Sequence, residues 1–94
     1  MAALPDDAST SDLGGGRAVT FFWRPGCGFC NRLRVGLVDA GVALDERNIW
    51  EDDEAAAFVR SVARGNETVP TVVVAGRPLV NPAAATVLEL LAAG

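Results

Sequence analysis

The chain has 94 residues, of which 50% are apolar and 21% charged, so we expect one small globular domain rather than a disordered protein. Its formal net charge of −4 argues against nucleic acid or an anionic membrane surface as a partner. No apolar stretch approaches the ~20 residues needed to span a bilayer, and the first residues lack the pattern of a secretory signal. We therefore predict a cytoplasmic protein.

The first sixteen residues show no hydrophobic period. They combine Asp, Ser and Thr with the run Gly14-Gly15-Gly16. Such a composition buries too little apolar surface to fold by itself. We predict a disordered N-terminal tail over residues 1–16 and a folded domain over residues 17–94.

The domain begins with a predicted strand and helix. The apolar, β-branched and aromatic run 18–23 is typical of a buried strand, and a helix is predicted over about 27–40. Pro25 and Gly26 turn the chain between them. Apolar side chains at helical spacing predict the helix face that packs on the sheet: Phe29, Leu33, Leu37 and Ala40.

Five further elements are predicted along the rest of the chain. They are a strand over 43–48, a helix over 53–63, a strand over 72–74, a strand over 77–80 and a helix over 82–92. Ala75-Gly76 predicts a tight hairpin turn between the last two strands. Asn81 and Pro82 have the residue types favoured at the N-cap and first position of a helix. The order β-α-β-α-β-β-α predicts an α/β domain whose four-stranded mixed sheet is flanked by three helices.

Cys27 and Cys30 are the only cysteines in the chain, and they stand at the predicted junction of strand and helix. A Cys-x-x-Cys in this context indicates a redox pair. The first cysteine falls where unpaired backbone N–H groups and the helix dipole favour negative charge, which can lower a thiol pKa from about 8.5 to roughly 3.5–7.5. We therefore predict that Cys27 is the nucleophile and that Cys30, one turn later, resolves a disulfide formed on it.

Three other interpretations of the two cysteines compete with the redox pair. A zinc site normally takes four ligands, and this chain has two cysteines and no histidine, so we predict no metal site within one chain. A structural disulfide would close too short a loop to restrain the unfolded chain much. Two buried, inert cysteines would leave the preceding Pro25-Gly26 unexplained. Arg24, just before the motif, is placed to help hold a Cys27 thiolate or to steer an anionic ligand.

The motif Cys27-Gly28-Phe29-Cys30 after the first strand, with Thr68-Val69-Pro70 before the third, resembles the glutaredoxin branch of the thioredoxin fold over about residues 17–94. Together with Trp23-Arg24-Pro25-Gly26 before the motif and Asn81-Pro82 after the fourth strand, it looks like the mycoredoxins. These are actinobacterial glutaredoxin-like proteins that use mycothiol in place of glutathione. The resemblance implies a thioredoxin-like fold and thiol–disulfide exchange.

The resemblance also implies a substrate site. Pro70 would be a cis proline that faces the nucleophile, and Val69 would offer its backbone N–H and C=O to an extended thiol ligand, as an added strand does. Trp50 either covers one side of this groove or caps the sheet. The expected substrate-binding residues are Arg24, Pro25, Phe29, Thr68, Val69, Pro70, Asn81 and Pro82.

Asn81-Pro82 departs from the pattern of glutathione-binding glutaredoxins, which usually carry Gly-Gly and an acidic or polar residue here. In those proteins the backbone N–H groups hold the γ-glutamyl carboxylate. Proline has no N–H, so Pro82 removes one donor. This difference weakens the prediction of glutathione as the ligand and fits a sugar-bearing thiol.

We therefore predict a monomeric oxidoreductase that reduces mixed disulfides between mycothiol and proteins. Mycothiol, or less favourably glutathione, would be the co-substrate, S-thiolated or oxidised proteins the partners, and no cofactor would be tightly bound. Two alternatives stay open. One is a dithiol reductase coupled to glutathione or thioredoxin reductase. The other is an iron–sulfur carrier in which two subunits each give Cys27 to a [2Fe–2S] cluster.

Overall fold

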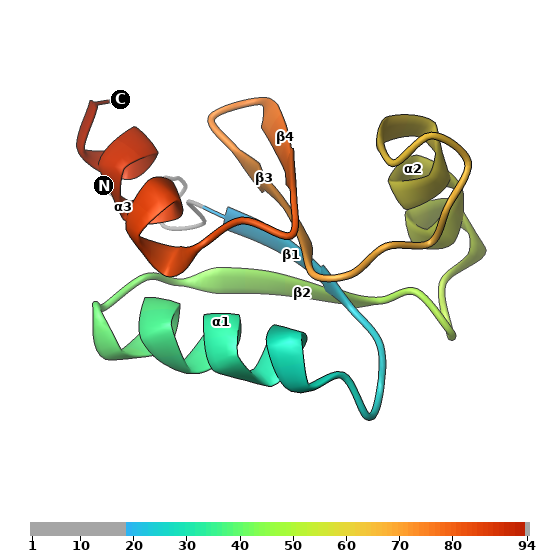
Figure 1. The fold of residues 1–94 in the computed structure, drawn as a ribbon, viewed down its shortest axis with the longest axis horizontal. Helices are drawn as coiled ribbons and strands as arrows, with labels where there is room; N and C mark the ends of the chain where they lie inside the picture. The colour runs from blue at the N-terminus through green and yellow to red at the C-terminus, as the bar shows by residue number, and fades with distance from the viewer. Residues whose placement is uncertain (1–18, 94) are drawn as a thin grey trace, which may run out of the picture.

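The computed structural model describes residues 19–93, so the predicted tail and the predicted domain boundary at residue 17 lie outside the described residues. The predicted order of elements is confirmed (Figure 1). The elements are β1 (Val19–Trp23), α1 (Gly28–Asp39), β2 (Leu44–Asn48), α2 (Asp53–Val62), β3 (Thr71–Val74), β4 (Arg77–Val80) and α3 (Ala84–Ala93). No helix within residues 19–93 has the length and apolar character needed to cross a bilayer.

The four strands form one mixed sheet in the order β2-β1-β3-β4. β1 pairs with β2 in parallel and β3 pairs antiparallel with β4, which makes the sheet mixed, as predicted. β1 also pairs antiparallel with β3. The hairpin turns at Ala75 and Gly76, which both have positive φ, at 51° and 80°, as a type I′ turn requires. Because Phe22 lies opposite Thr71, the segment that precedes β3 reaches the same end of the sheet as the loop that follows β1.

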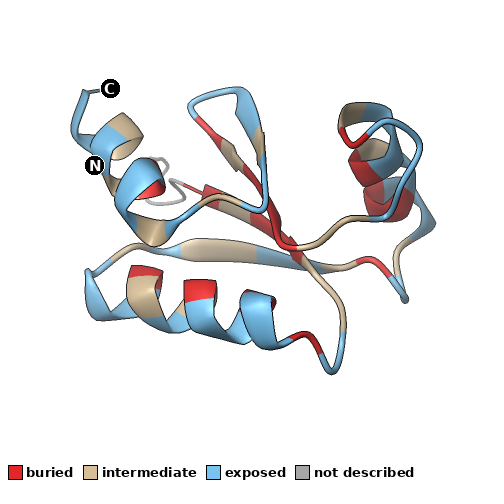
Figure 2. Cartoon of the chain, in the orientation of Figure 1, coloured by how far each residue is buried: buried red, intermediate tan, exposed pale blue. Residues whose placement is uncertain are grey.

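The helices cover both faces of the sheet, and neighbouring residues of β1 contribute to opposite faces. Phe21 packs in a cluster with α1 and α3, whereas Phe22 packs in a second cluster with α2, because side chains alternate along a strand. Phe22 stacks on Phe58 of α2 with ring centroids 5.0 Å apart. Figure 2 shows the buried positions along the central strands and on the inner sides of α1 and α2.

The predicted core face of α1 was wrong at its two ends. Leu33 and Leu37 are buried as expected, but the third buried residue of the helix is Cys30, and Phe29 is 62% exposed. Successive helical residues differ by about 100° in direction, so placing Cys30 in the core turns Phe29 toward solvent. Ala40 follows the helix as its C-cap and is exposed. A cysteine serves as a small apolar core residue, which the hydrophobic pattern did not take into account.

The prediction that Asn81 caps a helix beginning at Pro82 was also wrong, because α3 begins at Ala84. Asn81 has φ of 50°, whereas an N-cap residue has extended backbone. The carbonyl of Ala83 accepts the first helical bonds, from the N–H groups of Thr86 at 3.1 Å and Val87 at 3.3 Å. Asparagine tolerates the left-handed conformation, so Asn81 turns the chain out of β4 instead of starting the helix.

Candidate active site

Cys27 is the N-cap residue of α1. Its backbone is extended, with φ of −96° and ψ of 109°, and its Sγ accepts a hydrogen bond from the Cys30 N–H at 3.2 Å. Helix N-caps are usually serine, threonine or aspartate, whose side-chain oxygen accepts this bond. A sulfur in the same position faces the positive end of the helix dipole, which favours its anionic form. Both cysteines are free thiols.

The surroundings shift the pKa values of the two thiols in opposite directions. Burial alone would raise the pKa of Cys27, but hydrogen bonds from the Cys30 side chain and N–H, the charge of Arg24 and the Phe29 N–H outweigh it and lower that pKa. Burial, together with the hydrogen bond to Cys27 and the charge on its sulfur, raises the pKa of Cys30 to about 12. Cys27 therefore ionises first and Cys30 keeps its proton, which suits a nucleophile and a resolving thiol.

The segment before β3 lies against the nucleophile. The peptide bond between Val69 and Pro70 is cis, as the resemblance implied. The Val69 carbonyl oxygen lies 3.9 Å from Cys27 Sγ, and Pro70 is buried. The main chain beside the sulfur thus has an edge that an extended ligand can pair with.

Two hydrogen bonds hold this segment in place. The Thr71 hydroxyl donates to the carbonyl of Thr68 at 2.8 Å, and the Asn81 N–H donates to the carbonyl of Pro70 at 2.7 Å. Asn81 therefore connects the end of β4 to Pro70, the residue that follows the carbonyl facing the thiol. This long-range contact joins two motifs that are separated in the sequence.

Arg24 lies on another side of the site. Its guanidinium donates a hydrogen bond to the Pro25 carbonyl at 3.2 Å and lies over the ring of Trp50, 5.7 Å from the ring centroid. Trp50 is 62% exposed, so it does not cap the sheet. Instead its ring contacts the arginine whose charge favours the Cys27 thiolate.

A depression of about 380 Å³ lies between α1 and the connection from β4 to α3. It is lined by Phe29, Arg32, Leu33, Asn81, Pro82, Ala83 and Ala84. The helices approach closely near its margin, since a Cβ on Gly36 would lie 3.1 Å from that of Ala84. The depression brings together three of the predicted binding residues, Phe29, Asn81 and Pro82. The other five are not among its lining residues: Arg24, Pro25, Thr68, Val69 and Pro70.

Arg32 is a lining residue that the sequence prediction missed. Its guanidinium lies 5.8 Å from the centroid of the Phe29 ring. The signal in the sequence was that Phe29 and Arg32 are three positions apart, a spacing that places two side chains on the same surface of a helix. A solvated arginine near a helix end has the same spacing, so the sequence alone did not distinguish the two.

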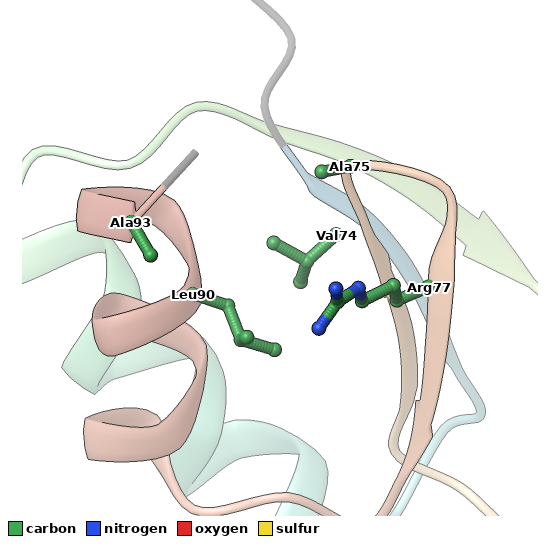
Figure 3. Close-up of a pocket in the computed structure, with 5 residues that line it drawn as sticks. All are labelled: Val74, Ala75, Arg77, Leu90 and Ala93. Carbon is green, nitrogen blue, oxygen red and sulfur yellow. The ribbon is translucent and has the colours of Figure 1, made fainter.

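A second cavity, of about 220 Å³, lies away from the cysteines. It is lined by Val74, Ala75, Arg77, Leu90 and Ala93 (Figure 3). Val74 pairs with Val19 at the start of β1, whereas Cys27 follows the end of that strand, so this cavity is at the opposite end of the sheet. It has no thiol among its lining residues and does not belong to the redox site.

Residues 19–93 contain no cluster of three or more His, Cys, Asp and Glu side chains that would hold a metal ion. Within this part of the chain, the sulfur ligands are Cys27 and Cys30 alone. Cys30 is fully buried, with 0% of its surface exposed. Cys27 is buried too, with 5% of its surface exposed, so it is the one of the two thiols that keeps any contact with solvent.

Comparisons with known proteins agree with this geometry. Residues 19–79 match the glutaredoxin family model. The chain is 46% identical over 68 residues to a predicted glutaredoxin of Mycobacterium tuberculosis, which covers 71% of this chain and 81% of that protein. It is 37% identical over 76 residues to mycoredoxin 1 of Corynebacterium glutamicum, with coverage of 80% and 94%.

Solved structures with the same fold include two glutaredoxins. The holo form of glutaredoxin C1 from Populus tremula x tremuloides is 27% identical with a TM-score of 0.59, over 78% of this chain and 72% of that one. The glutaredoxin of Archaeoglobus fulgidus has a TM-score of 0.63 at 22% identity, over 82% and 88% of the two chains, and supports the fold alone. With the family match over residues 19–79, the chain belongs to the glutaredoxin family and is a thiol–disulfide oxidoreductase with a thioredoxin-like fold.

Proposed function

We propose that this oxidoreductase reduces mixed disulfides between mycothiol and proteins in the cytoplasm, acting as a monomer with Cys27 as its nucleophile. The observation that carries the choice of thiol is Asn81-Pro82 at the depression beside Phe29 and Arg32. Pro82 has no N–H to offer the carboxylate of a γ-glutamyl group. The similarity to a protein named mycoredoxin 1 supports the same choice.

In the first step, the Cys27 thiolate attacks the mycothiol sulfur of the mixed disulfide. The bond between mycothiol and the protein sulfur breaks, and the protein leaves as a thiolate that takes a proton from water. Cys27 then carries mycothiol in a new disulfide. The lowered pKa of Cys27 supports this step, because the thiolate is the attacking species.

Two routes release the bound mycothiol. A second mycothiol thiolate attacks the mycothiol sulfur, which frees the Cys27 thiolate and gives mycothiol disulfide. Alternatively Cys30 loses its proton and attacks Cys27 Sγ, which frees mycothiol and leaves a Cys27–Cys30 disulfide. Since Cys30 is buried, with 0% of its surface exposed, the first route is the main one in this proposal.

The binding residues have separate roles in this proposal. Val69 pairs its main chain with the cysteinyl part of the ligand next to the sulfur, and Pro70 and Thr68 hold that main chain. The sugar part extends into the depression, where Phe29 supplies an apolar face and Asn81 an amide. Arg24 and Pro25 lie on the side of the site toward Trp50.

The test compares two thiols on one protein. The Cys30→Ser variant is given a small mixed disulfide with either mycothiol and its reductase or glutathione and its reductase. The proposal predicts a strong preference for mycothiol. A preference for glutathione would contradict it and leave a glutathione-dependent glutaredoxin. Absence of turnover with both would contradict it as well and favour the route through thioredoxin reductase or cluster transfer.

Pro82→Gly is the matched variant for the choice of thiol. It restores one backbone N–H at the depression while leaving the cysteines, Val69 and Arg24 unchanged. We expect its ratio of mycothiol to glutathione turnover to fall relative to that of the Cys30→Ser parent. An unchanged ratio would show that Pro82 does not select the thiol.

A further inference from the structure

Arg24 is the cation that favours the Cys27 thiolate, yet no carboxylate holds it. The arginine–carboxylate pairs within residues 19–93 are Arg34–Glu46, Arg47–Asp45 and Arg60–Glu67. Arg24 takes part in none of them. Its guanidinium donates a hydrogen bond to the neighbouring Pro25 carbonyl and lies over the ring of Trp50. An arginine side chain has many rotamers in water, so a contact beyond its own segment is needed to fix its charge.

Trp50 comes from a different segment, the connection between β2 and α2, and its backbone is anchored. The Trp50 N–H donates to Asn48 Oδ1 at 3.0 Å. The preceding residue, Ile49, is buried and donates its N–H to the Trp23 carbonyl at 2.9 Å. The ring therefore projects from a fixed position while remaining 62% exposed.

We propose that Trp50 is a positioning residue: its ring holds the Arg24 guanidinium in place by a cation–π contact, so that the positive charge stays beside the Cys27 sulfur. The contact distance of 5.7 Å from the guanidinium carbon to the ring centroid is within the range of such interactions. The inference depends on Cys27 as the nucleophile and is independent of which small thiol the enzyme uses.

Other groups near the Cys27 sulfur also influence this thiol, and the test must distinguish their effects from that of Arg24. Arg24 in the β1–α1 connection and the thiol and N–H of Cys30 in α1 lower the pKa of Cys27. The Val69 carbonyl, in the segment before β3, lies 3.9 Å from the Cys27 sulfur. Arg34 acts on Cys30 instead. On the side of Trp50, Asp52 is occupied as the N-cap of α2, where it accepts from the Ala55 N–H at 3.1 Å.

Glu51 is the charged residue adjacent to Trp50 in the chain. It directly follows Trp50 and is exposed, so it is the natural competitor for the guanidinium. Glu51→Gln removes this charge without touching the ring. It therefore serves as the matched control for substitutions of Trp50.

The readout is the pH dependence of Cys27 alkylation by iodoacetamide in the Cys30→Ser background. We expect Trp50→Ala to raise the pKa of Cys27, by no more than Arg24→Gln raises it, because the ring acts only through the position of the guanidinium. Trp50→Phe, which keeps an aromatic face, should restore most of the original value. Trp50→Ala combined with Arg24→Gln should give the same pKa as Arg24→Gln alone.

Three results would overturn the inference. The first is an unchanged pH profile of Cys27 alkylation in Trp50→Ala. The second is that Trp50→Ala shifts the Cys27 pKa as much in the Arg24→Gln background as it does with Arg24 present, which would mean that the ring acts without the arginine. The third is a larger shift in Glu51→Gln than in Trp50→Ala. Because the Trp50 side chain is mostly exposed, these variants should fold, which urea unfolding curves verify. None of these results depends on turnover with mycothiol.

Discussion

At the scale of single residues, the proposed function depends on the difference between two cysteines that are one helical turn apart. Cys27 caps the helix and accepts its N–H groups, whereas Cys30 lies in the core with 0% of its surface exposed. The same helix thus lowers the pKa of one thiol and buries the other. A two-residue spacing is what makes this arrangement possible.

Replacement of each cysteine by serine tests the assignment of roles. Cys27→Ser should abolish turnover, because no other accessible thiolate is present. Cys30→Ser should retain most of it, since a second small thiol completes the cycle without a resolving cysteine. Steady-state assays with a small mixed disulfide measure both. Complete loss in both variants would instead indicate an obligatory dithiol mechanism.

The pH dependence of stability has an unusually clear origin in this protein. The chain has no Lys, His or Tyr, so in mildly alkaline solution only the two thiols and the amino terminus titrate. The lowered pKa of Cys27 makes the free energy of unfolding rise with pH up to about 9, the ordinary thiol value. Above 9 the unfolded chain loses the Cys30 proton while the folded chain, with a pKa of about 12, keeps it, so the stability falls.

We therefore predict a maximum in the free energy of unfolding near pH 9 for the reduced protein. Cys30→Ala should remove the decline on the alkaline side. It should also make the rise on the acidic side smaller, because the Cys30 side-chain hydrogen bond that helps lower the pKa of Cys27 is lost. Urea unfolding under reducing conditions, over a series of pH values on both sides of the maximum, measures this. A decline of the same size in Cys30→Ala would assign the alkaline effect to another group.

At the scale of elements, local patterns predicted the strands, the helices and the place of Cys27 at a helix N-terminus, because each depends on neighbours in the sequence. The errors arose at residues whose conformation or burial depends on tertiary contacts. Asn81 was predicted to cap a helix, but its N–H is used by the carbonyl of Pro70, and the chain turns there. Phe29 was predicted in the core, yet Cys30 fills that place.

In the candidate site, too, local features were predicted from the sequence pattern and tertiary contacts were not. The motif around Cys27 was readable from its local pattern, whereas the place of Val69 against the sulfur was expected only from the resemblance to glutaredoxins. The contacts of Arg32 with Phe29 and of Trp50 with Arg24 were not predicted. Side chains on exposed surfaces have no hydrophobic period, so a sequence pattern does not fix their direction.

The N-cap of α2 gives a prediction at this scale. Asp52 Oδ1 accepts the Ala55 N–H at 3.1 Å, and its charge lies at the positive end of the helix. Asp52→Ala should lower the free energy of unfolding by about 1 kcal/mol, as loss of a cap does. Asp52→Asn, which keeps an acceptor oxygen, should lose less. Equal losses in urea unfolding would show that charge, rather than the cap bond, is responsible.

At the scale of the whole molecule, one sheet separates two apolar clusters, and the redox site belongs to one of them. Cys27 and Cys30 are members of the cluster formed by β1, β3, α1 and α3. The second cluster, with Phe22 and Val59, supports the opposite face. Chemistry and stability are therefore coupled on the side of α1, where the first turn of the helix is both site and core.

Leu37 tests how much this cluster contributes. It has 0% exposure, so Leu37→Ala should lower the free energy of unfolding by about 2–5 kcal/mol, a large part of the total for a small domain. Val38→Ala, one residue away but 54% exposed, should change it by less than about 0.5 kcal/mol. Urea unfolding of the two variants makes the comparison. Similar losses would mean that the face of α1 is assigned wrongly.

The most direct measurement of the central claim is the intact mass of the Cys30→Ser protein after reaction with one equivalent of a mycothiol–peptide mixed disulfide. The account predicts a gain equal to one mycothiol, located on Cys27, with the peptide released as its free thiol. A gain equal to the peptide, or an adduct with glutathione formed in preference when both mixed disulfides compete, would contradict it.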